Sequence, residues 1–260
     1  MTTTALAGRR AVVTGAGRGI GAAAARALAA AGAAVVLAAR TKAAIERTAA
    51  ALREAGADAL AIPCDVTIET DVRRLGDEAR RRGPVDILVL SAGDSASAPL
   101  PKITLEAWSA LMAVNATGTF LCVREFAPAM AERRFGRVVA IASIAGLHGG
   151  KYIAHYAAAK HAVVGLTRSV ALEYEGKGVT VNALCPGYVE TEMTARTLEN
   201  VRARTGLGPE DALAAILDTV GQSRLVTPAE VAAEVVRLCR PEAGAITGEA
   251  IVLDGGATTP

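Results

Sequence analysis

A tyrosine and a lysine four residues apart form the pair with the clearest chemical potential in the sequence. On a helix, Tyr156 and Lys160 would lie on the same face, because residues four apart are neighbours there. A tyrosine titrates near pH ~10, and a positive charge ~5 Å away at an effective dielectric of ~20 favours its phenolate by about 3 kcal/mol, or roughly two pH units. With its pKa lowered in this way, Tyr156 could exchange a proton with a bound substrate. Alone, such a pair is usually an exposed helix pair, so the interpretation depends on its neighbours.

Two polar residues upstream strengthen that interpretation. Ser143 follows a predicted strand over residues 137–142, so its hydroxyl would stand at the strand's carboxyl end, where it could hydrogen-bond a substrate oxygen. An ordinary turn residue is the alternative for Ser143. Asn115 lies in a helical stretch, where asparagine is unfavourable, which indicates a specific task for its amide. A water held by Asn115 could relay protons from Lys160.

A glycine-rich turn follows the first predicted strand. Residues 14–21 read Thr-Gly-Ala-Gly-Arg-Gly-Ile-Gly and lead into a helix. Gly15 would permit a tight turn, Gly19 would let backbone N–H groups approach phosphates, and Gly21 would let the helix pack closely on the strand. The positive end of that helix would face the phosphates. The turn predicts a dinucleotide pyrophosphate site, although a glycine-rich turn alone is weak support.

The ends of the next two strands indicate which dinucleotide binds. About 20 residues after the turn, an acidic side chain would read the ribose 2′-hydroxyl of NAD, but this chain has Arg40, Thr41 and Lys42 there. The planar guanidinium of Arg40 suits a 2′-phosphate, and Arg18 could approach that phosphate from the other side. NADP(H) is therefore favoured over NAD(H), unless Arg40 and Lys42 only solvate the start of a helix. Asp65, after the third strand, is placed to contact the adenine, and a helix N-cap is its other expected role.

These residues need a scaffold that gathers the ends of strands. Short apolar runs without a two-residue alternation, typical of strands covered on both faces, alternate with longer helical stretches. Strands are predicted over residues 11–14, 35–38, 59–63, 87–90, 137–142, 180–184 and 250–253, and helices over 20–31, 42–55 and 68–82. The pattern predicts one α/β domain over residues 1–260, with a Rossmann-like, doubly wound parallel sheet and helices on both of its faces.

One long connection interrupts this alternation. Residues 188–222, between the sixth and seventh strands, mix helix formers and charges with Gly206, Gly208 and Pro209. Because the connection starts at a strand's carboxyl end, it would lie over the ligand crevice of the sheet as a mobile substrate lid. Four basic residues on or near it could attract the phosphates of a carrier arm or coenzyme A, or could be solvated surface charges: Lys151, Arg196, Arg202 and Arg204.

Together, these motifs resemble the short-chain dehydrogenase/reductase family over nearly the whole chain. The resemblance implies that Tyr156 is the general acid/base and that Ser143 orients the substrate carbonyl. It also implies that Lys160 lowers the tyrosine pKa and binds the nicotinamide ribose, and that Asn115 supports a proton-relay water. A homotetramer is the assembly that the family implies.

The cofactor site implied by the resemblance is spread along the chain. It includes a Pro-Gly pair and a following threonine that resemble the family's nicotinamide-contacting segment. The implied cofactor-binding residues are Gly15, Arg18, Gly19, Ile20, Gly21, Arg40, Thr41, Asp65, Val66, Ala92, Gly93, Tyr156, Lys160, Pro186, Gly187, Val189 and Thr191.

One segment departs from the family pattern. After the fourth strand the family usually has Asn-Asn-Ala-Gly, whereas residues 90–93 read Leu-Ser-Ala-Gly. The glycine contact is kept, but the loss of both amides puts some hydrogen bonding beneath the cofactor in doubt. Within the family, residues 185–193 and the connection after them resemble 3-oxoacyl thioester and polyketide ketoreductases.

Composition argues against several other classes of protein. Apolar residues make up 52% of the chain and the net charge is +2, so a sizeable core is expected and neither nucleic acid nor a membrane surface is an expected partner. No apolar run reaches the ~20 residues of a membrane span, and residues 1–8 do not resemble a secretory signal, so a cytoplasmic protein is expected. The four cysteines should be reduced and buried. Neither they nor the three histidines have zinc-site spacing, so no metal is expected.

The sequence thus predicts an NADP(H)-dependent oxidoreductase that moves hydride between the nicotinamide and a carbonyl or secondary alcohol, with acyl thioesters and polyketide-like ketones as candidate small-molecule substrates. An NAD-dependent alcohol or 3-hydroxyacyl dehydrogenase is the nearest alternative. A non-catalytic dinucleotide-binding redox sensor is the alternative from another class. The altered residues 90–91 favour the sensor slightly. The intact catalytic tetrad of the family pattern, Asn115, Ser143, Tyr156 and Lys160, argues against it.

Overall fold

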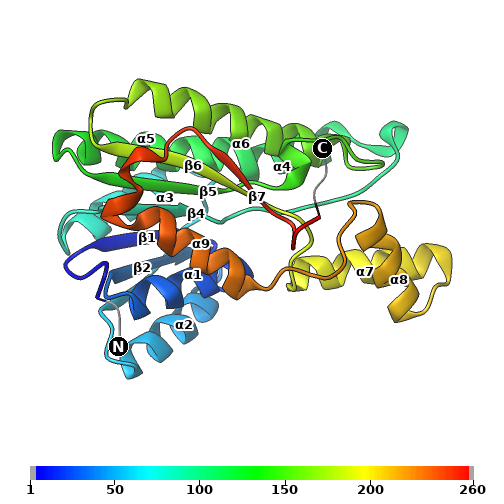
Figure 1. Cartoon of the computed structure of the whole chain (residues 1–260), viewed down its shortest axis with the longest axis horizontal. Coiled ribbons are helices and arrows are strands. Elements are labelled where there is room, and N and C mark those ends of the chain that lie inside the picture. The colour runs from blue at the N-terminus through cyan, green and yellow to red at the C-terminus, as the bar shows by residue number, and fades with distance from the viewer. Residues whose placement is uncertain (1–3, 258–260) are drawn as a thin grey trace.

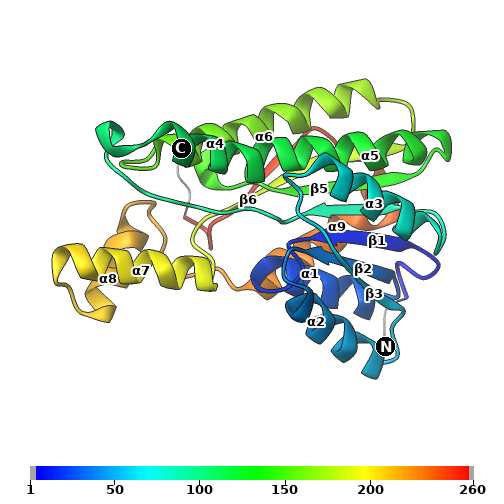
Figure 2. The same cartoon turned by 180° about the vertical axis from the view of Figure 1, so that it is seen from behind.

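Seven short apolar runs form one parallel sheet between layers of helices (Figures 1 and 2). The computed structural model describes residues 4–257. Within them the strands are β1 (Arg10–Thr14), β2 (Ala34–Ala39), β3 (Ala59–Pro63), β4 (Ile87–Leu90), β5 (Gly136–Ile141), β6 (Val179–Pro186) and β7 (Ala250–Leu253). Their order across the sheet is β3-β2-β1-β4-β5-β6-β7. All seven predicted strands are confirmed, with small shifts at their ends.

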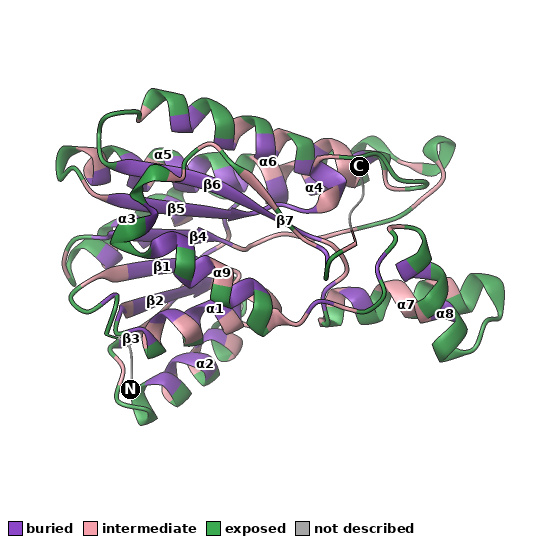
Figure 3. Ribbon diagram, in the orientation of Figure 1, coloured by how far each residue is buried: buried purple, intermediate pink, exposed green. Residues whose placement is uncertain are grey.

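Successive residues of each strand pack against opposite helical layers. The covering helices are α1 (Gly19–Ala30), α2 (Lys42–Glu54), α3 (Glu69–Arg80), α5 (Gly118–Glu132), α6 (Ala154–Glu173) and α9 (Pro228–Cys239). Val12 of β1 belongs to the core shared with α3, α5 and α6, whereas the adjacent Val13 belongs to the core shared with α1, α2 and α9. Figure 3 shows the buried residues concentrated in the sheet and on the inner faces of these helices. The predicted doubly wound sandwich is confirmed, and its two buried faces explain the continuous apolar runs.

The strand order brings the candidate residues to one edge of the sheet. From β1 the chain runs outward through β2 to β3, and then returns to form β4 on the other side of β1. Open α/β sheets bind ligands in the crevice at such a reversal, at the carboxyl ends of the strands. The glycine turn follows β1 there, Gly93 follows β4, and Ser143 follows β5.

The segment over residues 188–222 contains two helices that project beyond this edge (Figures 1 and 2). They are α7 (Glu192–Thr205) and α8 (Pro209–Asp218). The base of the projection is closed, because the Tyr188 N–H donates to Oε1 of the buried Gln222 at 2.7 Å and Val189 pairs with Val226 in a parallel bridge. The predicted lid therefore corresponds to a distinct excursion, and its movement stays a prediction.

Two further observations concern the described part of the chain. Its four cysteines are buried and free of disulfide bonds, as predicted. Among residues 4–257, no helix is long and apolar enough to cross a bilayer.

Candidate active site

The turn after β1 has the backbone geometry that close approach to phosphates requires. Gly15 and Gly19 have φ angles of +66° and +52°, which glycine adopts most easily. A Cβ on Gly15 would lie 2.7 Å from the carbonyl oxygen of Ser91, and a Cβ on Gly21 would overlap the carbonyl of Gly15. The turn therefore folds tightly between β1 and β4, and α1 begins directly above it with its amino terminus at the crevice.

The unusual residues 90–91 keep their backbone hydrogen-bonded. Oγ1 of Thr14 accepts hydrogen bonds from the N–H groups of Ser91 at 3.1 Å and Ala92 at 3.2 Å. Leu90 is buried in the core beneath them. One hydroxyl thus supports the loop that carries Gly93. No local pattern predicts this role of Thr14, because its partners lie more than seventy residues away.

Ser143 connects the end of the sheet with Tyr156. Its Oγ accepts a hydrogen bond from the Ala145 N–H at 3.1 Å and donates to the Pro186 carbonyl at 3.5 Å. The single proton of the Ser143 hydroxyl can be given to the Tyr156 oxygen instead, and that hydrogen bond lowers the pKa of Tyr156. Ser143 therefore has the expected turn role and also lies beside the phenol, whereas its hydrogen bond to a substrate oxygen stays a prediction.

The pKa of Tyr156 differs from the expectation. Burial raises it to about 12, which outweighs the Ser143 hydrogen bond, and the nearby Asp94 raises it further. The Lys160 ammonium lies 5.8 Å from the ring centroid and donates to the Ile141 carbonyl at 2.9 Å. Burial lowers the pKa of Lys160 itself to about 8. The predicted lowering of the tyrosine pKa is therefore wrong for the protein alone, because desolvation of the phenol outweighs the one lowering contact, that with Ser143.

Asn115 lies in a π-helical turn, Ala113–Thr117, between α4 (Leu105–Met112) and α5. Its Nδ2 donates to two backbone carbonyls, one of them that of Asp94, at 3.0 Å. Its Oδ1 is buried without a hydrogen-bond partner. A Cβ on Gly93 would lie 2.6 Å from that oxygen and 3.5 Å from Lys160 Nζ, so the three residues meet under the crevice. An unpaired buried acceptor in a π turn is typical of a functional site.

The residues predicted to choose the cofactor have different surroundings. Arg40 is exposed at the carboxyl end of β2, and Thr41 occupies the N-cap position of α2. Arg18 instead donates to Oε2 of Glu192, at the start of α7, at 2.6 Å. Arg18 therefore faces the 188–222 segment rather than Arg40.

Asp65 shapes the loop after β3 without capping a helix. Its Oδ1 accepts from the Thr67 N–H at 3.0 Å and from Thr67 Oγ1 at 2.8 Å. The N-cap residue of α3 is Ile68, so the expected N-cap role of Asp65 is wrong. The aspartate closes a local turn instead, and its contact with the adenine stays a prediction.

The segment after β6 packs against both the base of the 188–222 segment and the glycine turn. Gly187 packs against the side-chain amide of Gln222, which a Cβ would overlap. Thr191 caps α7, and its Cγ2 would lie 3.4 Å from a Cβ on Gly19. Gln222 could not be predicted from the sequence, because its side-chain amide bonds to backbone 34 residues away and no short motif marks such a contact.

The remaining predicted cofactor residues differ in access. Ile20 and Ala92 are partly buried at the edges of the two cores. The side chains of Val66 and Val189 are buried within the cores, so only their backbone atoms could contact a cofactor. Pro186 is likewise buried as the last residue of β6.

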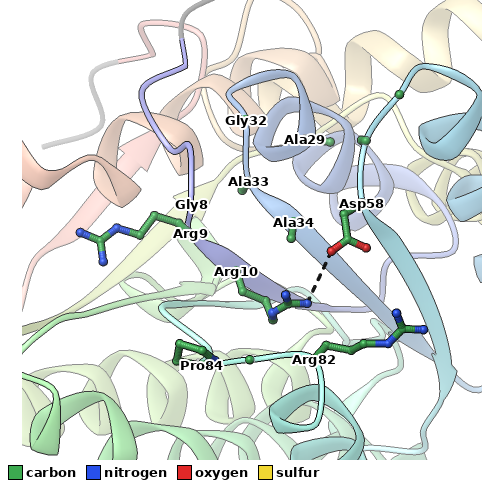
Figure 4. Close-up of a pocket in the computed structure, with 13 residues that line it drawn as sticks. Gly8, Arg9, Arg10, Ala29, Gly32, Ala33, Ala34, Asp58, Arg82 and Pro84 are labelled. Atoms are coloured by element: carbon green, nitrogen blue, oxygen red, sulfur yellow. Dashed lines mark ion pairs between the residues drawn. The ribbon is translucent and has the colours of Figure 1, made fainter.

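A cavity of about 350 Å³ lies at the opposite, amino-terminal edge of the sheet (Figure 4). Arg10, which forms a 3.8 Å ion pair with Asp58, and Arg82 line it. The helices α1 and α2 end there, and positive side chains are favourable beside carboxyl termini of helices. The arginines of this cavity are therefore explained by the helix ends beside them. None of Asn115, Ser143, Tyr156 and Lys160 lines the cavity.

Comparisons with known proteins agree with this geometry. The family model described as short chain dehydrogenase matches residues 9–202. The chain belongs to that family. It is 40% identical to an oxidoreductase of Bacillus subtilis, YxjF, over 95% of this chain and 97% of the relative, and 37% identical to a 3-oxoacyl-[acyl-carrier-protein] reductase of Synechocystis over 97% and 98%. A crystal structure of an actinorhodin polyketide ketoreductase variant with NADPH superposes with a TM-score of 0.93, at 38% identity and with full coverage of both chains.

The protein is thus an NAD(P)-dependent short-chain dehydrogenase/reductase related to ketoacyl and polyketide ketoreductases. These relatives give no support to the alternative of a non-catalytic redox sensor. The residues present fit a dinucleotide: the turn has two glycines with positive φ, and no side chain on Gly93 blocks the unpaired Oδ1 of Asn115. The glycine turn would hold the pyrophosphate, and the crevice beside Gly93 would hold the nicotinamide end.

We predict that Lys160→Met stabilises the fold at neutral pH. Burial lowers the pKa of Lys160 from 10.5 to about 8, so the folded protein binds this proton more weakly than the unfolded chain does. The buried charge costs up to about 3 kcal/mol below pH ~8, and this cost disappears as the pH rises from ~8 to ~10.5. Chemical denaturation should show the variant more stable at pH 7 by about 1–3 kcal/mol, since loss of the bond to Ile141 offsets part of the gain. The difference should shrink at pH 10, and a difference that grows with pH would contradict the assignment.

Proposed function

We propose that the protein reduces ketones with NADP(H), with Tyr156 as the proton donor. The observation that carries this proposal is that Tyr156 lies within hydrogen-bonding reach of the Ser143 hydroxyl and beside Lys160 at the carboxyl edge of the sheet, next to the glycine turn. A bound nicotinamide would supply the hydride. The protein's own part is to hold the carbonyl oxygen and to protonate it.

The charges of the site suit reduction. Tyr156 is a protonated phenol at neutral pH, which is the form that donates as negative charge develops on the substrate oxygen. Because its pKa is raised to about 12, the donation depends on stabilisation of the phenolate that forms. Ser143 Oγ would hold that oxygen by a hydrogen bond. The Lys160 ammonium, which is mostly protonated at pH 7, would stabilise the phenolate that remains. In the oxidative direction the same phenol would act as the base after losing its proton, so cofactor preference is what separates this proposal from the NAD-dependent dehydrogenase alternative.

Acyl thioesters are the proposed substrate class. The Synechocystis relative is named for a 3-oxoacyl substrate on acyl-carrier protein, and the structural relative is a polyketide ketoreductase. Arg202 and Arg204 are exposed near the end of α7, where they could attract the phosphate of a carrier arm. Arg196 is less available, because it forms a 2.7 Å ion pair with Asp94.

Tyr156→Phe tests the catalytic assignment. Loss of the proton donor should lower kcat for ketone reduction at least about 100-fold while the Kd for NADPH changes less than about twofold. NADPH consumption and fluorescence titration measure the two effects, with Tyr174→Phe at the other end of α6 as the matched control. Retention of kcat in Tyr156→Phe would remove Tyr156 from the proposed role.

A comparison of a free ketone with the thioester of the corresponding 3-oxo acid tests the substrate class. The thioester should have a kcat/KM at least about tenfold higher, because contacts remote from the reacting carbonyl add transition-state binding. Equal values for the two substrates would refute the thioester proposal and leave the ketone reductase intact.

Arg40→Asp tests the choice of cofactor. Replacing the guanidinium by a carboxylate should weaken NADPH binding at least about tenfold and shift the preference toward NADH, because the 2′-phosphate loses a partner and meets a like charge. The Kd values of both cofactors measure this, with Arg47→Asp on α2 as a control of equal charge change. An unchanged preference would show that Arg40 only solvates the start of α2.

A further inference from the structure

Helix α7 is joined to both sides of the crevice by ion pairs. Glu192, its first residue, pairs with Arg18 of the glycine turn at 2.6 Å. Arg196, one turn later, pairs with Asp94, in the loop after β4, at 2.7 Å. Glu192 and Arg196 lie on one face of α7, because they are four residues apart. We call these two pairs the α7 latch.

A phosphate that binds both Nη atoms of Arg18 would displace Glu192, whose Oε2 holds Nη1 at 2.6 Å. The side chains of Arg18 and Glu192 are 65% and 68% exposed, so their pair is weak and easily exchanged. A phosphate monoester carries up to about two negative charges and three acceptor oxygens, and it can bind a guanidinium through two parallel hydrogen bonds. In a direct exchange, the phosphate is therefore favoured over the single carboxylate of Glu192.

We propose that Glu192 competes with the 2′-phosphate of NADP(H) for Arg18, so that the phosphorylated cofactor opens one half of the α7 latch. The inference rests on the proposed function, because it takes NADP(H) as the ligand. In the free protein Glu192 keeps Arg18 on the side of α7, away from Arg40. When NADP(H) binds, Arg18 exchanges Glu192 for the phosphate. NADH has no 2′-phosphate and leaves the pair intact.

The second half of the latch connects this exchange to the catalytic residues. Asp94 accepts a hydrogen bond from Asn115 through its carbonyl and raises the pKa of Tyr156 through its charge. The Arg196–Asp94 pair uses neither Arg18 nor the 2′-phosphate, so the exchange leaves α7 with this one pair, on the catalytic side. The identity of the cofactor is thereby transmitted to the segment that borders the substrate crevice.

Glu192→Gln tests the competition directly. The variant should bind NADPH about two- to fivefold more tightly, which is the range that exposed ion pairs contribute. Its affinity for NADH should change by less than about 1.5-fold, because that cofactor does not recruit Arg18 to a 2′-phosphate. Fluorescence titration of both cofactors gives the two Kd values, and the gain for NADPH should fade at ~0.5 M salt, where exposed charges are screened.

Glu190→Gln is the matched control. Glu190 is exposed, lies two residues before Glu192, and loses the same charge on substitution. A general effect of negative charge near the crevice would therefore change NADPH binding equally in both variants. The competition predicts the gain in Glu192→Gln alone.

Amide hydrogen exchange tests the latch in the protein without cofactor. The first turn of α7 should exchange faster in Glu192→Gln and in Arg18→Gln, and the double variant should exchange no faster than Glu192→Gln. Glu192 also lies at a helix amino terminus, where a negative charge is favourable without any partner. If that effect acts alone, Arg18→Gln leaves the exchange rate unchanged.

Three results would overturn the inference: equal affinity gains for NADPH and NADH, a NADPH affinity no higher than that of Glu190→Gln, or unchanged exchange in Arg18→Gln. Each can occur in a protein that binds NADPH and reduces ketones normally, so the proposed function would survive. Failure of the wild-type protein to bind NADPH would instead overturn the proposed function and the latch together.

Discussion

The burial of one ammonium group constrains the whole site. Nζ of Lys160 is held by the carbonyl of Ile141, at the end of β5, and burial lowers its pKa to about 8. A charge in such a place is unfavourable unless rigid elements hold it against a suitable acceptor. Here α6 is fixed to the sheet by Val163 and Val164, one turn beyond the lysine, in the core shared with α3 and α5. The position of the cation thus follows from apolar packing of the same helix.

Burial also shifts the pKa of the Tyr156 phenol, but upward, whereas it shifts that of Lys160 downward. Burial disfavours the ionised form of both Tyr156 and Lys160, so each group alone would tend toward neutrality. A phenolate beside an ammonium is a mutually compensated state, whereas a lone phenolate in this place is not. The site therefore makes the ionised tyrosine accessible only while the lysine stays protonated, and groups with such displaced pKa values are characteristic of catalytic centres.

The parts of this structure that could be predicted from sequence are those encoded by short spacing. Three such features are local, and all appear in the structure: the apolar runs of the strands, the glycine turn after β1 and the four-residue interval between Tyr156 and Lys160. The pKa of Tyr156 could not be predicted, because it depends on how many distant segments exclude water from the phenol. Asp65 shows the same limit on a small scale, because its hydrogen bonds to Thr67 replace the expected N-cap.

Polar contacts between residues far apart in the sequence are a second feature that local patterns do not encode. Gln222 closes the base of the 188–222 segment through its hydrogen bond with Tyr188. Arg18 pairs with Glu192, which lies 174 residues later in the sequence. The two contacts differ in burial, and that difference separates their roles. The buried amide of Gln222 has bonds that water cannot easily replace, so it suits a permanent closure. The exposed Arg18–Glu192 pair lies where water and phosphate compete with it, so its low stability is what permits exchange. A stronger, buried pair at that position would hold α7 more firmly but would oppose the cofactor that the glycine turn is shaped to receive.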